Sequence, residues 1–95
     1  AGAAHQIAHD PDVTPDGGAT LDPDALVEET ILCCRAALDR APAGTRILGV
    51  GASCFWHSVV GVDLDGNPVT PVLLWSDRRS AAQAARLRAA LPDAP

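Results

Sequence analysis

The stretch that decides the fold of this chain is Arg46–Ser80, which reads RILGVGASCFWHSVVGVDLDGNPVTPVLLWSDRRS. Its first part, Arg46–Ser53, is apolar at most positions and is broken by glycines, which predicts a central parallel strand buried on both faces. Further strands are predicted over Ser58–Val62 and Val69–Trp75. The residues Asp65-Gly66-Asn67 between them are typical of a hairpin turn, so these two strands should pair antiparallel.

Helices are predicted on both sides of this stretch. Asp22 is a good N-cap and Pro23 a good first residue for a helix that ends at 41–44. Its apolar positions recur at helical spacing and predict one buried face: Val27, Ile31, Cys34 and Leu38. An Ala-rich helix is predicted over Ser80–Leu91.

The remaining segments complete a mixed α/β unit. Ala3–Ala8 is predicted as a short strand, and His9–Thr20, rich in Pro, Gly and Asp, as a loop. Pro71 cannot donate to a ladder, so it should lie at a sheet edge or a bulge. One buried strand and one hairpin need neighbours, and the sheet is therefore expected to be incomplete.

Composition excludes several classes of protein. The 95 residues allow one small domain at most, and the net charge of −5 argues against a nucleic-acid or anionic-membrane surface. The three cysteines are odd in number and two are adjacent, so a disulfide framework is not expected and a reducing cytoplasm is. The sequence shows no signal peptide and no apolar run of membrane-spanning length.

Large polar and aromatic side chains follow the predicted strands. Trp56 and His57 come after the strand Arg46–Ser53, and Trp75 and Asp77 come at the end of the hairpin. In open α/β sheets, ligands bind beyond the carboxyl ends of strands. Two indoles beside an imidazole and a carboxylate can stack on a sugar and hold its hydroxyls, although a core His and a core Trp remain the alternative.

Two weaker patterns in the sequence have plainer interpretations. Asp16–Thr20 fits Asp-x-Gly-x-Thr, a phosphate-gripping pattern in some kinases, but it lacks apolar strands around it and is better interpreted as a flexible loop. Cys54 and His57 are three residues apart. They fall short of the four ligands of a structural zinc site, and nothing obvious orients the His for nucleophilic catalysis.

Taken in order, Ile47–Ser80 resembles the FGGY family of carbohydrate kinases. The family pattern has a strand ending Gly-x-Ser, a variable triplet containing His, a strand ending in Asp, a turn with Gly and Pro, and Trp-x-Asp-x-Arg followed by Ser or Thr. The matching residues here are Gly51-Ala52-Ser53, Trp56-His57-Ser58, Asp63, Gly66 with Pro68, and Trp75, Asp77, Arg79 and Ser80. Upstream, Leu21-Asp22-Pro23 resembles the family's Gln-Asp-Pro. Trp56 stands where Met is commoner.

The resemblance implies an actin/ribonuclease H-like fold with two such domains and a cleft between them. Sugar binds in the first domain, and ATP with Mg²⁺ mostly in the second. Trp56, His57 and Trp75 match positions that line the sugar pocket, and Asp77 matches a recurrent Asp. Arg79 and Ser80 are expected to be structural or helix-capping.

The resemblance therefore makes residues 1–95 part of the N-terminal, sugar-binding domain of a cytoplasmic kinase. The phosphate hairpin, the catalytic Asp and the nucleotide-binding domain are expected outside these residues, so the chain should carry no catalytic, cofactor or metal residue and be inactive alone. Expected partners are a sugar or sugar acid, gluconate first and xylulose second, the rest of its own polypeptide, and a second copy in a homodimer. The alternatives are a non-catalytic sugar-binding or regulatory relative, and an α/β interaction module with a chance resemblance.

Overall fold

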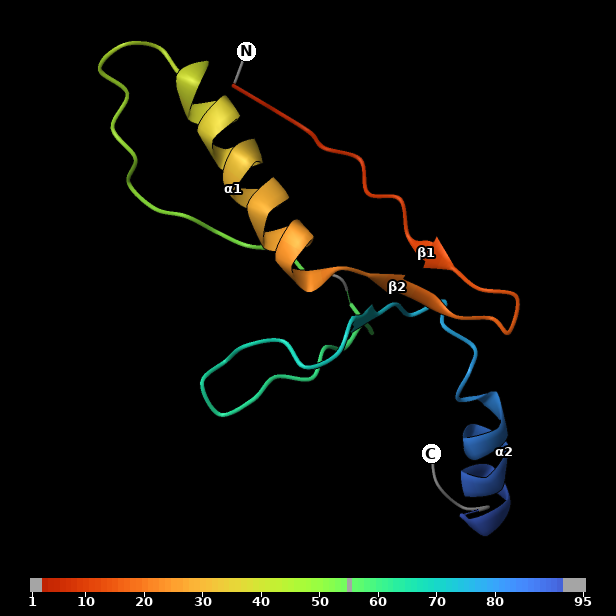
Figure 1. Cartoon of the computed structure of the whole chain (residues 1–95). Helices are drawn as coiled ribbons and strands as arrows, with labels where there is room; N and C mark the ends of the chain where they lie inside the picture. Colours follow the sequence, from red (N-terminus) through yellow and green to blue (C-terminus); the bar gives the residue numbers. More distant parts are fainter. Residues whose placement is uncertain (1–2, 55, 92–95) are drawn as a thin grey trace.

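The computed structural model describes residues 3–54 and 56–91 and shows a small, open α/β arrangement (Figure 1). The elements in chain order are β1 Asp12–Val13, β2 Ala19–Leu21, α1 Pro23–Asp39, β3 Val72–Leu73 and α2 Ala81–Ala90. The Cα radius of gyration is 18.5 Å, against about 12 Å for a compact domain of this length. The elements therefore share little buried surface.

The sheet has three strands in the order β1-β2-β3, and both pairs are antiparallel. Thr20 lies at its centre, opposite Asp12 on one side and Leu73 on the other. The expected mixed sheet with a central parallel strand is therefore wrong for the described residues. Short antiparallel pairs form because local turns bring their strands together, whereas a parallel pair needs a long crossover connection.

The loop predicted for His9–Thr20 is wrong in part, because it contains β1 and the start of β2. Between them the backbone turns tightly, with Thr14 N–H donating to Gly18 O at 3.0 Å and Gly17 N–H to Thr14 O at 2.9 Å. Gly17 has a φ of 91°, which glycine adopts without strain. The Asp16–Thr20 pattern thus lies in a hairpin, with strands of only two and three residues around it.

Helix α1 begins where its capping residues predicted. One carboxylate oxygen of Asp22 accepts hydrogen bonds from the backbone N–H groups of Asp24 and Ala25, at 2.9 and 3.2 Å, and Pro23 is the first helical residue. These bonds satisfy donors that have no partner within the helix. The helix ends at Asp39, just before the predicted stop at 41–44.

The strand predicted over Ala3–Ala8 is not present. This segment is irregular, and side chains of α1 and of its C-cap bond its backbone: Cys33 Sγ donates to His5 O at 3.2 Å, and Arg40 Nη1 to Ala4 O at 2.8 Å. A regular strand needs a neighbouring strand that pairs with its backbone N–H and C=O groups. Here side chains from the helix and its C-cap bond two of the carbonyls instead, and the segment stays irregular.

The strand predicted over Arg46–Ser53 is also wrong. This segment returns from the far end of α1 toward the sheet without regular structure (Figure 1), and Val50 is 92% exposed. No backbone hydrogen bond joins it to another part of the described chain. Its apolar pattern suits a strand covered on both faces, and nothing among the described residues pairs with it.

The predicted antiparallel pairing of Ser58–Val62 with Val69–Trp75 is confirmed, although it is discontinuous. Val59 pairs with Leu73, and Val62 pairs with Pro68. Gly66, with a φ of 86°, lies in the turn between them, as predicted. The two arms thus form a short hairpin that adds Val59 to the edge of β3.

Pro71 causes the break in this hairpin. Two residues, 60 and 61, separate the paired positions on one arm, and four, 69–72, separate them on the other, so the second arm bulges. The Oγ1 of Thr70 accepts the N–H of Gly61 at 2.8 Å in place of a ladder carbonyl. The expectation that Pro71 would lie at an edge or bulge is confirmed.

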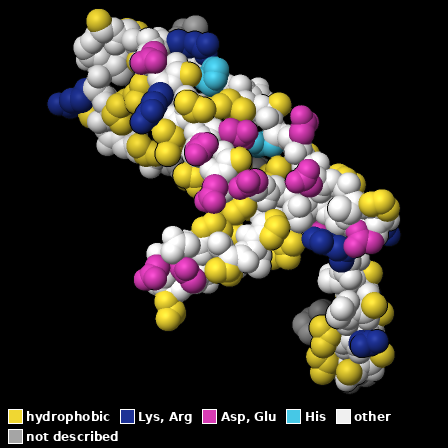
Figure 2. Space-filling model, in the orientation of Figure 1, with side chains coloured by type: hydrophobic (Ala, Val, Ile, Leu, Met, Phe, Trp, Pro, Cys, Tyr) yellow, Lys and Arg dark blue, Asp and Glu magenta, His cyan; other side chains and the backbone are white. Residues whose placement is uncertain are grey.

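Very little of the described chain is buried. Only Ala19 and Val72 form a core, while the apolar face predicted for α1 stays open, with Val27 59% and Leu38 53% exposed. Hydrophobic side chains accordingly lie on the visible surface along α1, the 59–73 hairpin and α2 (Figure 2). Helix α2 spans Ala81–Ala90, within one residue of its predicted bounds at each end.

None of the helices in the described part of the chain is both long enough and apolar enough to span a membrane.

The open packing predicts that the 95-residue chain on its own unfolds without a cooperative heat-absorption peak. A compact domain of this length absorbs roughly 65 kcal/mol on unfolding near 60 °C, because packing and hydration terms scale with chain length. Scanning calorimetry measures this enthalpy, and binding of a dye that recognises exposed apolar surface provides a second readout. A sharp two-state transition of that enthalpy would contradict the account.

Candidate functional site

Three of the four residues singled out in the sequence line one cavity. Its volume is about 550 Å³, and it lies where the Val59–Leu73 pair meets the turn that precedes α2. The lining residues are His57, Val59, Leu73, Leu74, Trp75, Asp77, Arg79 and Ser80. The structure thus brings an imidazole, an indole, a carboxylate and a guanidinium together over an apolar floor.

The fourth residue, Trp56, does not line this cavity. Its ring stacks on that of His57, with centroids 5.1 Å apart and planes 13° from parallel. Trp56 is 82% exposed and Trp75 is 75% exposed, so neither indole is a core residue of the described chain. Both offer flat apolar faces at the surface, the arrangement that stacking on a sugar ring requires.

His57 adopts an unusual backbone conformation. Its φ of 63° lies in the left-handed region, and it is the only non-glycine residue with positive φ in the described chain. Such a conformation costs of order 1–3 kcal/mol and is often found at functional sites, where the surroundings enforce it. The pairing of Val59 with Leu73, two residues later, fixes where this turn delivers the imidazole.

The carboxylate of Asp77 is held by several donors. Its Oδ2 accepts Arg79 Nη2 at 2.6 Å, Arg79 Nε at 3.0 Å and the backbone N–H of Ala19 at 3.1 Å. Its Oδ1 accepts the backbone N–H of Arg79 at 3.0 Å. The Asp77 side chain is only 11% exposed, against 42% for Arg79.

These contacts set the electrostatics of the cavity edge. The Arg79 side chain holds the pKa of the Asp77 carboxyl well below its usual range, and the amides of Ala19 and Arg79 lower that pKa further. The same ion pair raises the pKa of the Arg79 guanidinium. Asp77 is therefore an anion at neutral pH and accepts hydrogen bonds without serving as a proton donor.

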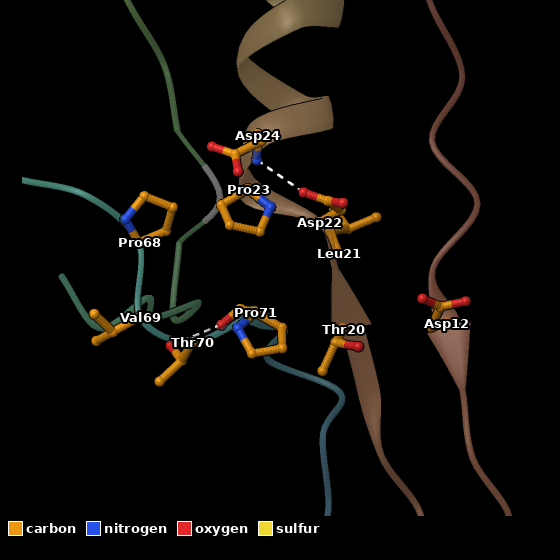
Figure 3. Close-up of a pocket in the computed structure, with 10 residues that line it drawn as sticks. All are labelled: Asp12, Thr20, Leu21, Asp22, Pro23, Asp24, Pro68, Val69, Thr70 and Pro71. Atoms are coloured by element: carbon orange, nitrogen blue, oxygen red, sulfur yellow. Dashed lines mark hydrogen bonds between the residues drawn. The ribbon is translucent and has the colours of Figure 1, made fainter.

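A second cavity, of about 410 Å³, lies between β2, the start of α1 and the bulged arm of the hairpin (Figure 3). Acidic side chains line one side of it, from Asp12, Asp22 and Asp24, and the rings of Pro68 and Pro71 line the other. The Asp22 carboxylate is used in capping α1. This cavity contains none of the residues expected to bind sugar, and it has no aromatic side chain.

The Cys54–His57 pattern gains no support from the geometry. All three cysteines are free thiols, and Cys54 is exposed. Among residues 3–54 and 56–91, no three His, Cys, Asp or Glu side chains are placed to hold a metal ion.

Sequence comparison identifies the family. The N-terminal domain of the FGGY family of carbohydrate kinases matches residues 2–93, and the chain therefore belongs to this family. The resemblance stated from the ordered motifs is confirmed. No solved structure matches the chain with statistical significance.

The chain is similar to several curated relatives called xylulose kinase. It is 40% identical over 79 residues to the one from Streptomyces coelicolor, and 39% identical over 79 residues to the one from Streptomyces rubiginosus. Each match covers 79% of this chain and 15% of the relative. The one from Staphylococcus xylosus is 28% identical over 67 residues, 70% of this chain and 14% of the relative. The chain thus spans about 15% of the length of these relatives.

Sequence reasoning missed the part that Arg79 plays at the cavity. The residue was expected to be structural or helix-capping, and it both lines the cavity and pairs with Asp77. Ser80 occupies the N-cap position of α2, but its side chain makes no capping bond. Asp and Arg two residues apart in a turn signal a local ion pair. No local pattern could indicate the bond from Asp77 to Ala19, 58 positions away.

Arg79→Ala is expected to raise the pKa of the Asp77 carboxyl toward the usual Asp value, because the guanidinium is the largest cause of its lowering. A group whose pKa is lowered by folding stabilises the folded state above its unfolded-state pKa. That contribution disappears as the pH falls through the folded-state pKa. Titration of the carboxyl carbon by NMR measures the shift. Arg78→Ala is the matched control, and equal Asp77 values in wild type and Arg79→Ala would refute the assignment.

Proposed function

We propose that this chain forms part of the sugar-binding domain of an ATP-dependent carbohydrate kinase, and that the cavity beside His57 and Trp75 receives the acceptor sugar. The observation that carries the proposal is that His57, Trp75 and Asp77, separated by up to 20 positions, line one cavity in a chain of this family. The rest of its own polypeptide would supply the remaining parts of the enzyme.

The side chains around the cavity suit a polyhydroxylated ligand. The exposed indole of Trp75 can cover the apolar face of a sugar, and the imidazole of His57 can exchange hydrogen bonds with a hydroxyl. Trp56, stacked on His57, would hold the imidazole ring in place and extend the apolar surface. Asp77 lines the same cavity, and its carboxylate borders the proposed sugar site.

Among sugars, we favour a ketose such as xylulose over gluconate. The curated relatives are called xylulose kinase, and two of them share 40% and 39% identity with this chain. Gluconate, the sugar acid that the resemblance placed first, becomes the comparison substrate. Gluconate is also polyhydroxylated, but it carries a carboxylate that xylulose lacks.

ATP and Mg²⁺ do not fit the residues present. The single carboxylate at the cavity is already paired with Arg79, and no cluster of metal-ligating side chains occurs in the described chain. We therefore assign both to other parts of the polypeptide. The chain's own part is to bind and orient the acceptor, which contributes to phosphoryl transfer through positioning. His57 serves as a hydrogen-bond partner, and no residue here is assigned as general base.

In the longer protein, His57→Ala should weaken sugar binding roughly tenfold, because a buried hydrogen bond is lost and a ligand hydroxyl is left unpaired. Nucleotide binding should be nearly unchanged. Titration calorimetry with xylulose, gluconate and a non-hydrolysable nucleotide separates these effects. His5→Ala is the control, since His5 contacts Arg40 at the other end of α1. Unchanged sugar affinity in His57→Ala would rule out the pocket assignment.

The 95-residue chain alone should show no sugar-dependent ATP turnover, because we assign none of its described residues to phosphate binding or to general-base catalysis. A coupled assay for ADP with either sugar tests this against a heat-inactivated sample. Sugar-dependent ATP turnover by the pure chain would contradict the assignment of ATP binding and catalysis to other parts of the polypeptide. Sugar binding by the longer protein without any turnover would favour the non-catalytic relative instead.

A further inference from the structure

The turn that carries Trp75 is attached, on both sides of that residue, to the end of the β1–β2 turn and the first residue of β2. Before it, Leu74 N–H donates to Ala19 O at 3.0 Å. After it, Arg78 N–H donates to Gly17 O at 2.8 Å, and the Asp77 carboxylate accepts the N–H of Ala19 at 3.1 Å. Trp75 is therefore held between two anchor points, and one of them depends on a side chain.

The carboxylate that makes this anchor has little capacity left for a ligand. Its two oxygens already accept the guanidinium of Arg79, the amide of Arg79 and the amide of Ala19. An ionised carboxylate offers about four lone-pair sites. A sugar hydroxyl would have to displace one of these charge-assisted donors to reach it.

The guanidinium also lies close to Gly18. A Cβ at this position would clash with Thr14 Oγ1 and would lie 3.1 Å from Arg79 Nε and 3.2 Å from Cζ, so the absence of a side chain leaves room both for the Thr14 hydroxyl and for the approach of the guanidinium to the backbone of the β1–β2 turn. Arg79 thus lies between this turn and Asp77 while it also lines the sugar cavity. The two side chains join an N-terminal hairpin to one wall of the cavity.

We infer that Asp77 and Arg79 are positioning residues for the sugar pocket, which fix Trp75 through the β1–β2 turn, and that Asp77 acts through Arg79 and Ala19 without contacting the sugar. This inference rests on the proposed function, and it gives Asp77 a positioning role in place of a sugar-binding one. It makes the β1–β2 turn a determinant of sugar affinity, although the turn itself contributes no residue to the cavity lining.

The test compares Asp77→Asn, Arg79→Lys and the double variant in the longer protein. Each single change should raise the KM for sugar roughly tenfold, as expected when a charge-assisted hydrogen bond is lost. The KM for ATP and kcat should stay within about twofold. Because both changes break the same pair, the double variant should be no worse than the more affected single variant. Asp65→Asn and Arg78→Lys are matched controls that leave the pair intact.

Several outcomes would overturn the inference. If Asp77→Asn raises the KM for sugar and Arg79→Lys does not, Asp77 contacts the sugar directly. If both variants lower kcat in proportion to the folded fraction and leave the KM for sugar unchanged, the pair is only structural. Should Asp77→Asn fail to fold, Arg79→Lys carries the test, and a KM for sugar unchanged in that variant would refute the inference. Failure of the proposed function would be seen separately. The longer protein would then lack kinase activity, or its His57→Ala variant would keep the sugar affinity of the wild type.

Discussion

The bond between the Asp77 carboxylate and the Ala19 amide, with Arg79 closing on the same carboxylate, is the contact on which the rest of this structure depends. The sheet itself is small: β2 and β3 share two residue pairs. Ala19 is one of the two buried hydrophobic residues of the described chain, so the anchor lies at the small core. Through it, a turn near the N-terminus determines where the C-terminal arm of the hairpin presents Trp75.

Two apolar segments of the described chain lie outside the small sheet and are exposed. Helix α1 has an apolar face at regular spacing, and Arg46–Ser53 has the composition of a central strand, yet both face solvent in the described chain. The chain spans about 15% of the length of the xylulose kinases it resembles. Among the described residues, nothing covers these two faces.

Features set by neighbouring residues could be predicted from the sequence. Asp22 with Pro23 located the start of α1, Asp65-Gly66 located the hairpin turn, and Pro71 located the bulge, because each depends on backbone chemistry within a few positions. The strand at Arg46–Ser53 could not be judged in the same way, since burial depends on partners elsewhere in the chain. The β1–β2 hairpin was missed because its strands are too short to show alternation.

The site was predicted to a similar extent. Ordered motifs identified the family and three residues of one cavity, and the stacking of Trp56 on His57 explains why the fourth lies outside the cavity lining. The role of Arg79 could not be read from sequence spacing, because it depends on Gly18 and Ala19, about sixty positions earlier. Contacts of such separation become visible only when the chain is folded.

The most direct test of the account is a crystal structure of the longer protein with its sugar bound. We expect the sugar to lie against His57 and Trp75, with the Asp77 carboxylate still bonded to Arg79 and Ala19 and out of contact with the sugar. A sugar bound away from His57 and Trp75, or one that displaces Arg79 to bond directly to Asp77, would contradict it.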